Sequence, residues 1–159
     1  MVVSLYHSGE NQMNDYETYE VRVYKNGNKT WLQNDEYHRT DGPAIEYANG
    51  DKTWYVNGKL HREDGPAVEE ISGYKSWWKN GARHRTDGPA IEYANGENSW
   101  WQNDKLHRTD GPAIEWSDGT KFWYIDGVPY AEKEFKKKMN SCDGKTVTVD
   151  GKEYRLTAI

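Results

Sequence analysis

Residues 54–69 read WYVNGKLHREDGPAVE, and close variants of this stretch recur along the chain every 23 residues. In four copies the pair His-Arg is followed, after one further residue, by Asp-Gly-Pro-Ala, a β-branched residue and Glu. Tryptophan keeps the same period, at Trp31, Trp54, Trp77, Trp100 and Trp123. A fixed period of this length indicates a repeat protein in which each unit packs only against its neighbours.

Each unit has the pattern of a β-hairpin. The segment 52–56 is aromatic and β-branched, as strands prefer, and Asn57 with Gly58 supplies the positive φ angles of a two-residue hairpin turn. The segment 59–62 then predicts a returning strand, which Asp-Gly-Pro interrupts because proline donates no ladder hydrogen bond and glycine permits a bend. Stacked units therefore predict an all-β fold, an elongated and twisted antiparallel meander of β-hairpin repeats.

The pattern divides the chain into three parts. Residues 1–20 are predicted to form an N-terminal cap or partly disordered lead-in. A strand is expected at 19–24, and residues 2–6 either add another strand or fray. Residues 21–127 form the repeat array. Residues 128–159 are predicted to form a C-terminal cap, made of a short helix at 131–139 and a terminal hairpin at 146–156, because the open ends of a repeat array need covering.

The composition favours a thin fold and restricts the partners. The chain has 8 Trp and 12 Tyr but few aliphatic residues, so aromatic rings must supply much of the buried surface. A net charge of −5 argues against a nucleic-acid partner, which needs a basic face. The single Cys142 cannot form an intramolecular disulfide, and no apolar run is long enough for a signal or membrane segment. We predict a cytoplasmic protein that does not enter a membrane.

The unit W-x-x-N-G-K-x-H-R-x-D-G-P-A-x-E-x-x-x-x-G resembles the MORN repeat, over residues 21–127. Two features depart from that family: Arg follows His where MORN repeats usually carry Gly, and Asp-Gly-Pro-Ala replaces a simpler Gly-x-Gly. This version is similar to MORN-like arrays in tailed-phage, giant-virus and bacterial proteins. The resemblance implies a ribbon of hairpins with a protein-docking role. The lipid contact reported for some MORN proteins has no basic cluster to support it here.

Neither a metal site nor a catalytic site is predicted. Equivalent histidines of successive units are two strands apart, about 9.5 Å, whereas zinc holds its ligands within about 2.3 Å. Identical units give their carboxylates identical environments, so no pair has the separated pKa values of an acid and a base. We therefore expect no cofactor and no enzymatic activity. Arg62 is expected to tie Asp64 and Glu69 around the kinked strand, as its counterparts do in the other units.

The residues that vary between units are the candidates for binding. Alternation along the strand places the invariant tryptophans on one face, which we assign to packing, and a varied row of large side chains on the other. Departures from the Tyr-Ala found at 47–48 and 93–94 add two further positions. The protein-binding candidates are Tyr55, Trp78, Trp101, Tyr124, Leu32, Glu70 and Ile71. The alternative is that this row forms the other half of a thin core.

Two functions follow from these residues. The first is a non-enzymatic protein-binding repeat protein, most concretely a phage-type anti-defence inhibitor that docks on a host enzyme or immune effector in the host cytoplasm. The alternative is a nucleotide sponge, in which aromatic rings stack on a base and arginines bind the phosphates. Its anion-binding candidates are Arg39, Arg62, Arg85 and Arg108. The protein is expected to be a monomer, or a dimer formed through an open strand edge.

Overall fold

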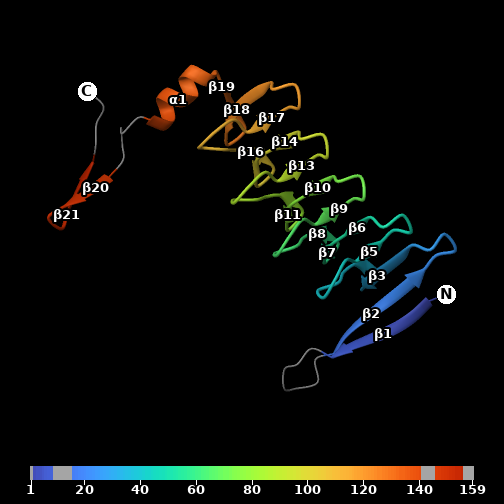
Figure 1. The fold of residues 1–159 in the computed structure, drawn as a ribbon. Coiled ribbons are helices and arrows are strands. Elements are labelled where there is room, and N and C mark those ends of the chain that lie inside the picture. Colours follow the sequence, from blue (N-terminus) through green and yellow to red (C-terminus); the bar gives the residue numbers. More distant parts are fainter. Residues whose placement is uncertain (1, 9–15, 141–145, 156–159) are drawn as a thin grey trace.

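The computed structural model describes residues 2–8, 16–140 and 146–155, and the array forms one long open sheet (Figure 1). This main sheet has 13 strands, and all of its pairings are antiparallel. Along its path lie β1 (Val2–Ser8), β2 (Tyr16–Val23), β3 (Lys29–Gln33), β5 (Ile45–Glu46), β6 (Lys52–Thr53), β9 (Val68–Glu69), β10 (Lys75–Ser76), β13 (Ile91–Glu92), β14 (Asn98–Ser99), β17 (Ile114–Glu115), β18 (Lys121–Ile125) and β19 (Val128–Tyr130), with β4 (Glu36–Tyr37) paired to β3. The predicted meander of stacked hairpins is confirmed.

A second row of short hairpins runs beside the main sheet. Its two-stranded members are β7 (Tyr55–Val56) with β8 (Lys59–Leu60), β11 (Trp78–Lys79) with β12 (Ala82–Arg83), and β15 (Trp101–Gln102) with β16 (Lys105–Leu106). Backbone bonds join successive hairpins, for example from Arg62 N–H to the Trp78 carbonyl at 3.2 Å and from Gly81 N–H to the Leu60 carbonyl at 2.9 Å. The second row is therefore also continuous from unit to unit.

The segment 52–56 is not the single strand that the sequence predicts. It divides into β6 and β7, and Trp54 lies between them. The N–H of Trp54 donates to the Ala67 carbonyl at 2.8 Å, and its own carbonyl accepts from His61 N–H at 3.1 Å. Both partners belong to the returning limb of the same unit, so the chain leaves the main sheet at Trp54 and enters the hairpin row.

The turns have the geometry that their residues indicate. Asn57 and Gly58 have φ angles of 50° and 68°, so both positions adopt the left-handed conformation of a type I′ turn. In the first unit Asn34 and Asp35 adopt φ angles of 52° and 62° without a glycine, since short polar side chains tolerate this region.

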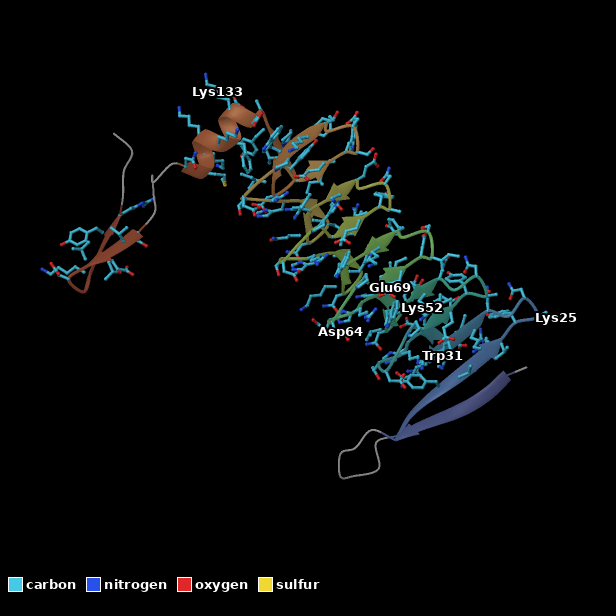
Figure 2. The ribbon with its side chains drawn as sticks, viewed as in Figure 1. Lys25, Trp31, Lys52, Asp64, Glu69 and Lys133 are labelled. Carbon is cyan, nitrogen blue, oxygen red and sulfur yellow. The ribbon has the colours of Figure 1, made fainter. Side chains whose placement is uncertain are left out.

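The register separates two faces of the main sheet. Across the pairings from β3 to β18 one face, which we call the polar face, carries alternating Lys and Glu, interrupted at Asn98. Lys52 and Glu69 are one such pair and lie side by side in Figure 2. The opposite face carries small and β-branched side chains, of which Thr53 is 7% and Ser76 0% exposed. The alanine of each Asp-Gly-Pro-Ala is fully buried, at Ala44, Ala67, Ala90 and Ala113.

The two ends of the array differ. At the N-terminal end β1 pairs with β2, so residues 2–6 lie in a strand, and Tyr19 Oη lies 3.2 Å from Thr40 Oγ1 of the first unit. At the other end α1 (Glu132–Asn140) contacts β18 and buries Phe135. None of the helices in the described residues has the length and apolar character needed to cross a membrane.

The terminal hairpin forms as predicted, from β20 (Thr146–Val149) and β21 (Lys152–Arg155). Every residue of these two strands is exposed, and the hairpin lies apart from the array in Figure 1. Of the two parts of the predicted cap, α1 contacts β18 of the array, whereas the strands of the hairpin are exposed. Cys142 lies outside the described residues.

Candidate functional site: an aromatic face on a tied scaffold

On the polar face, each invariant arginine lies over the invariant tryptophan of its own unit. The distance from the guanidinium carbon to the ring centroid is 4.2 Å for Arg39, 4.0 Å for Arg62, 3.9 Å for Arg85 and 3.9 Å for Arg108. A cation so placed is attracted to the electron-rich ring face. The polar face therefore contains a cation–π pair in each of these four units.

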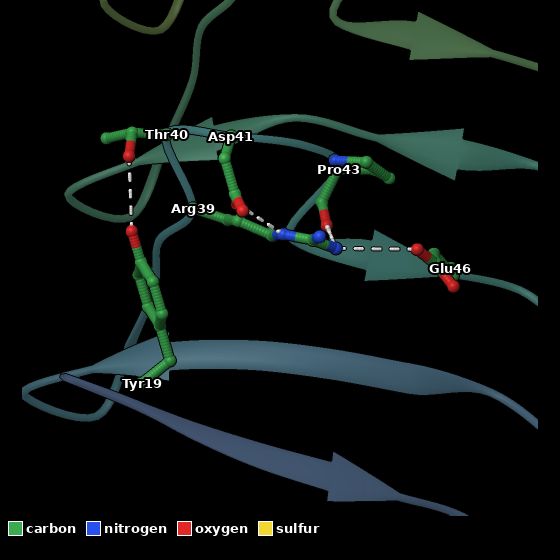
Figure 3. Close-up of polar contacts among 6 residues, drawn as sticks. All are labelled: Tyr19, Arg39, Thr40, Asp41, Pro43 and Glu46. Carbon is green, nitrogen blue, oxygen red and sulfur yellow. Dashed lines mark hydrogen bonds and ion pairs between the residues drawn. The ribbon is translucent and has the colours of Figure 1, made fainter. Parts of the chain in front are cut away.

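The same guanidinium forms hydrogen bonds to several residues of the kinked returning strand of its own unit. Arg62 Nε donates to Asp64 at 2.9 Å, while Nη1 donates to the Pro66 carbonyl at 3.3 Å and to Glu69 at 2.9 Å. Figure 3 shows the equivalent bonds of Arg39 in the first unit. The predicted structural tie is confirmed, and the hydrogen bond from Arg62 lowers the pKa of the Asp64 carboxyl below its usual value.

The glycine of Asp-Gly-Pro-Ala is explained by the same arginine. A Cβ at Gly65 would lie 2.9 Å from the guanidinium carbon of Arg62, which is closer than real Cβ contacts allow. Gly42, Gly88 and Gly111 are equally close to their own arginines. Only glycine gives the guanidinium this space.

The histidines join successive units. Nδ1 of His61 accepts the backbone N–H of Asn80 at 3.0 Å, and Nδ1 of His107 accepts that of Asp126 at 3.2 Å. These partners lie 19 residues ahead, in the turn of the next hairpin. The sequence favours half-buried histidines that pack on a neighbouring tryptophan, and it gives no sign of this bond to the next hairpin. Among the residues that the structure describes, no three His, Cys, Asp or Glu side chains come together as a metal site.

Clefts separate successive Asp-Gly-Pro loops on the side of the polar face. The cleft between the second and third units has a volume of about 500 Å³ and is lined by Asp64, Trp77, Lys79 and Arg85, among others. The arginines that line it already donate to two carboxylates and a carbonyl. A phosphate bound by the four candidate arginines would therefore compete with carboxylates at every unit.

The opposite side of the array carries most of the predicted binding residues. The indole N–H of Trp78 donates to Ser76 Oγ at 2.8 Å and that of Trp101 to Ser99 Oγ at 2.7 Å, so these rings lie on the side opposite the polar face. Tyr55, Trp78, Trp101 and Tyr124 are half-buried in this row, whereas Leu32 is only 5% exposed and presents little surface. Glu70 and Ile71 are exposed, at the turn between the second and third units.

Further residues join this row that the sequence reasoning did not single out. Arg83 lies with its guanidinium carbon 3.6 Å from the ring centroid of Trp101 and 5.9 Å from that of Trp78. Tyr37 lies 5.4 Å from Tyr55 between ring centroids. The hairpin register could have found both, because a two-residue turn places Arg83 opposite Trp78 and Tyr37 opposite Leu32.

A second row of rings lies toward the other long edge. Alternation from the buried Ile45 and Ile91 places Tyr47 and Tyr93 on this same side, and Trp116 occupies the equivalent position in the last unit. Burial is the main cause that raises the pKa of the Tyr55 hydroxyl, and the neighbouring Tyr47 and Tyr37 raise it further. We call this side the aromatic face, defined by Tyr37, Tyr47, Tyr55, Trp78, Arg83, Tyr93, Trp101, Trp116 and Tyr124.

No protein-family model matches this chain, and no curated protein matches it.

Proposed function

We propose that this protein binds another protein through its aromatic face and catalyses no reaction. The observation that carries the proposal is the contrast between the two faces. On the polar face the same Trp, Arg, Gly and Glu recur and bind one another. On the aromatic face large side chains change identity from unit to unit, as Tyr55, Trp78 and Trp101 do in one row. Variation on a fixed scaffold is expected of a surface shaped to one partner.

The exposure of the outer rings supports the same conclusion. Tyr93 is 48%, Trp116 47% and Tyr47 40% exposed, and together they form a row along the array. Exposed aromatic rings on a rigid surface are common energetic centres of protein interfaces, because they bury much area and lose little conformational entropy. The four steps between the five units, at about 9.5 Å each, give a surface about 38 Å long, which is enough for a standard interface.

The finer form of the proposal is a phage-type inhibitor that docks on a host enzyme or immune effector. It rests on the resemblance of the repeat to MORN-like arrays, which stays an interpretation of the sequence. We place the nucleotide sponge second, because the four arginines it requires each donate to two carboxylates.

Affinity capture with matched variants tests the proposal. The bait would be the wild-type protein, the double variant Tyr93→Ala/Trp116→Ala, and a polar-face control, Lys52→Ala/Lys75→Ala, whose two side chains are also exposed. We expect one partner to be retained by wild type and control and lost by the aromatic variant, while circular dichroism melting stays alike. Retention by the aromatic variant would contradict the proposal. A nucleotide found by native mass spectrometry would favour the sponge.

A further inference from the structure

We propose that the partner segment which binds the aromatic face is a basic amphipathic helix. Its apolar side chains would cover the rings, and its lysines or arginines would face acidic side chains that have no cation beside them. This inference rests on the proposed function, and it adds the chemistry of the partner.

The array separates its charges by face. The lysines of the main-sheet strands in the described units are Lys29, Lys52, Lys75 and Lys121, and each is in register with a glutamate on the polar face. The polar-face glutamates also receive the invariant arginines, as Glu69 does from Arg62 at 2.9 Å. Positive and negative charges on the polar face are therefore matched within the protein.

The aromatic face has the opposite balance. Asp51 and Glu97 lie two residues before the buried-face residues Thr53 and Ser99, and Glu70 takes the position that Tyr47 occupies one unit earlier. Alternation places all three acids on the aromatic side. They lie at the turns that lead into the second, third and fourth units, beside the exposed rings.

These three carboxylates are bonded only to neutral groups within the described part of the chain. Asp51 accepts the N–H of Ile71 at 2.9 Å, Glu70 accepts the hydroxyl of Ser72 at 2.9 Å, and Glu97 accepts that of Ser117 at 3.1 Å. The arginine of this face, Arg83, is already paired with Asp104 at 2.7 Å. The face thus presents apolar rings and uncompensated negative charge, and a partner with apolar and cationic side chains complements both.

Backbone hydrogen bonding favours a helix over an extended peptide. The strands beneath the aromatic face are hydrogen-bonded to their neighbours, so the face offers side chains rather than free backbone groups. An extended peptide laid across it would bury backbone groups without partners, whereas a helix satisfies its own. The units repeat at about 9.5 Å, close to the roughly 10.5 Å that separates residues i and i+7 on one face of a helix.

Two synthetic peptides test the inference. Both are 21-residue amphipathic helices with leucine on the apolar face, and the polar face carries lysine in one and glutamate in the other. We expect isothermal titration calorimetry to give at least about tenfold tighter binding for the lysine peptide, with the difference shrinking in high salt. Glu70→Gln/Glu97→Gln should weaken lysine-peptide binding several-fold. The control Glu63→Gln/Glu153→Gln removes two exposed charges elsewhere and should not.

The outcomes separate this inference from the proposed function. If both peptides bind equally and Tyr93→Ala/Trp116→Ala abolishes the binding of both, the aromatic face binds protein segments, but the inference that the partner segment is basic is wrong. If neither peptide binds, the basic helix is likewise overturned. If the lysine peptide binds that aromatic variant as tightly as wild type, the attraction is general charge, and the inference and the proposed binding face both fail.

Discussion

The arginine of the third unit offers the most direct test of what holds the array together. Arg85 lies 3.9 Å from the ring of Trp77 and donates to Asp87 at 2.9 Å, to the Pro89 carbonyl at 3.1 Å and to Glu92 at 2.8 Å. Its side chain is 20% exposed, so these contacts are only partly screened by water. Replacing Arg85 by Met removes all of them while keeping most of the apolar stem.

The expected loss is worked from these contacts. A partly exposed cation–π contact contributes about 0.5–1 kcal/mol. The bond to the carbonyl contributes about 1 kcal/mol, and each exposed ion pair contributes about 0.2–1 kcal/mol. Arg85→Met should therefore lower the free energy of unfolding by about 2–4 kcal/mol. Arg85→Lys should lose about 1.5–3 kcal/mol, because an ammonium keeps the charge but cannot make the forked bonds and the stack together.

Urea unfolding followed by tryptophan fluorescence measures both losses. Arg155→Lys is the matched control, because Arg155 is exposed on the terminal hairpin and its substitution should change stability by less than about 0.5 kcal/mol. If Arg85→Lys were as stable as wild type, the contribution of this arginine would be charge alone. The forked hydrogen bonds of the guanidinium and its contact with the Trp77 ring would then not be what stabilises the unit.

Three further predictions concern the same contacts. Gly88→Ala places a Cβ 2.8 Å from the guanidinium carbon of Arg85, so it should destabilise by about 1–2 kcal/mol and be clearly non-additive with Arg85→Met in a double-mutant cycle. His61→Phe removes the acceptor of the Asn80 N–H and should cost about 0.5–1.5 kcal/mol in thermal or urea unfolding. The hydrogen bond from Arg85 lowers the pKa of Asp87. The pair therefore contributes fully to the stability of the fold above the ordinary Asp pKa of about 3.9, and this contribution is lost as the pH falls further. Asp87→Asn should reduce the acid dependence of the urea midpoint, and an unchanged dependence would argue against this pairing.

Much of this fold could be predicted from the sequence because its determinants are local. Asn57 and Gly58 specify their turn, and a two-residue turn fixes which residues face each other across the hairpin. Arg62, Asp64 and Glu69 lie within seven residues of one another, so a bond among them needs no knowledge of the tertiary structure. The helix and the terminal hairpin were predictable for the same reason.

What the sequence could not supply depends on how one unit lies against the next. The bond from His61 to Asn80 spans 19 residues and exists only because the following hairpin stacks in a particular register. The division of the strand at Trp54 follows from bonds to the returning limb, which a strand pattern alone does not place. The partial burial of the candidate row also depends on this stacking, since the same alternation fits a binding surface and a thin core.

The repeat separates positions whose side chains recur in every unit from positions whose side chains vary. Where Arg, Trp, Gly and His recur in successive units, the recurring contacts among them account for their presence, and no partner is needed to explain them. The ring position held by Tyr47, Tyr93 and Trp116 becomes Glu70 in the second unit, although the backbone there makes the same turn bonds as its neighbours. The fold thus tolerates either a ring or a carboxylate at that place. Stacking does not choose between them, and under the proposed function it is the partner that selects the side chains along this row.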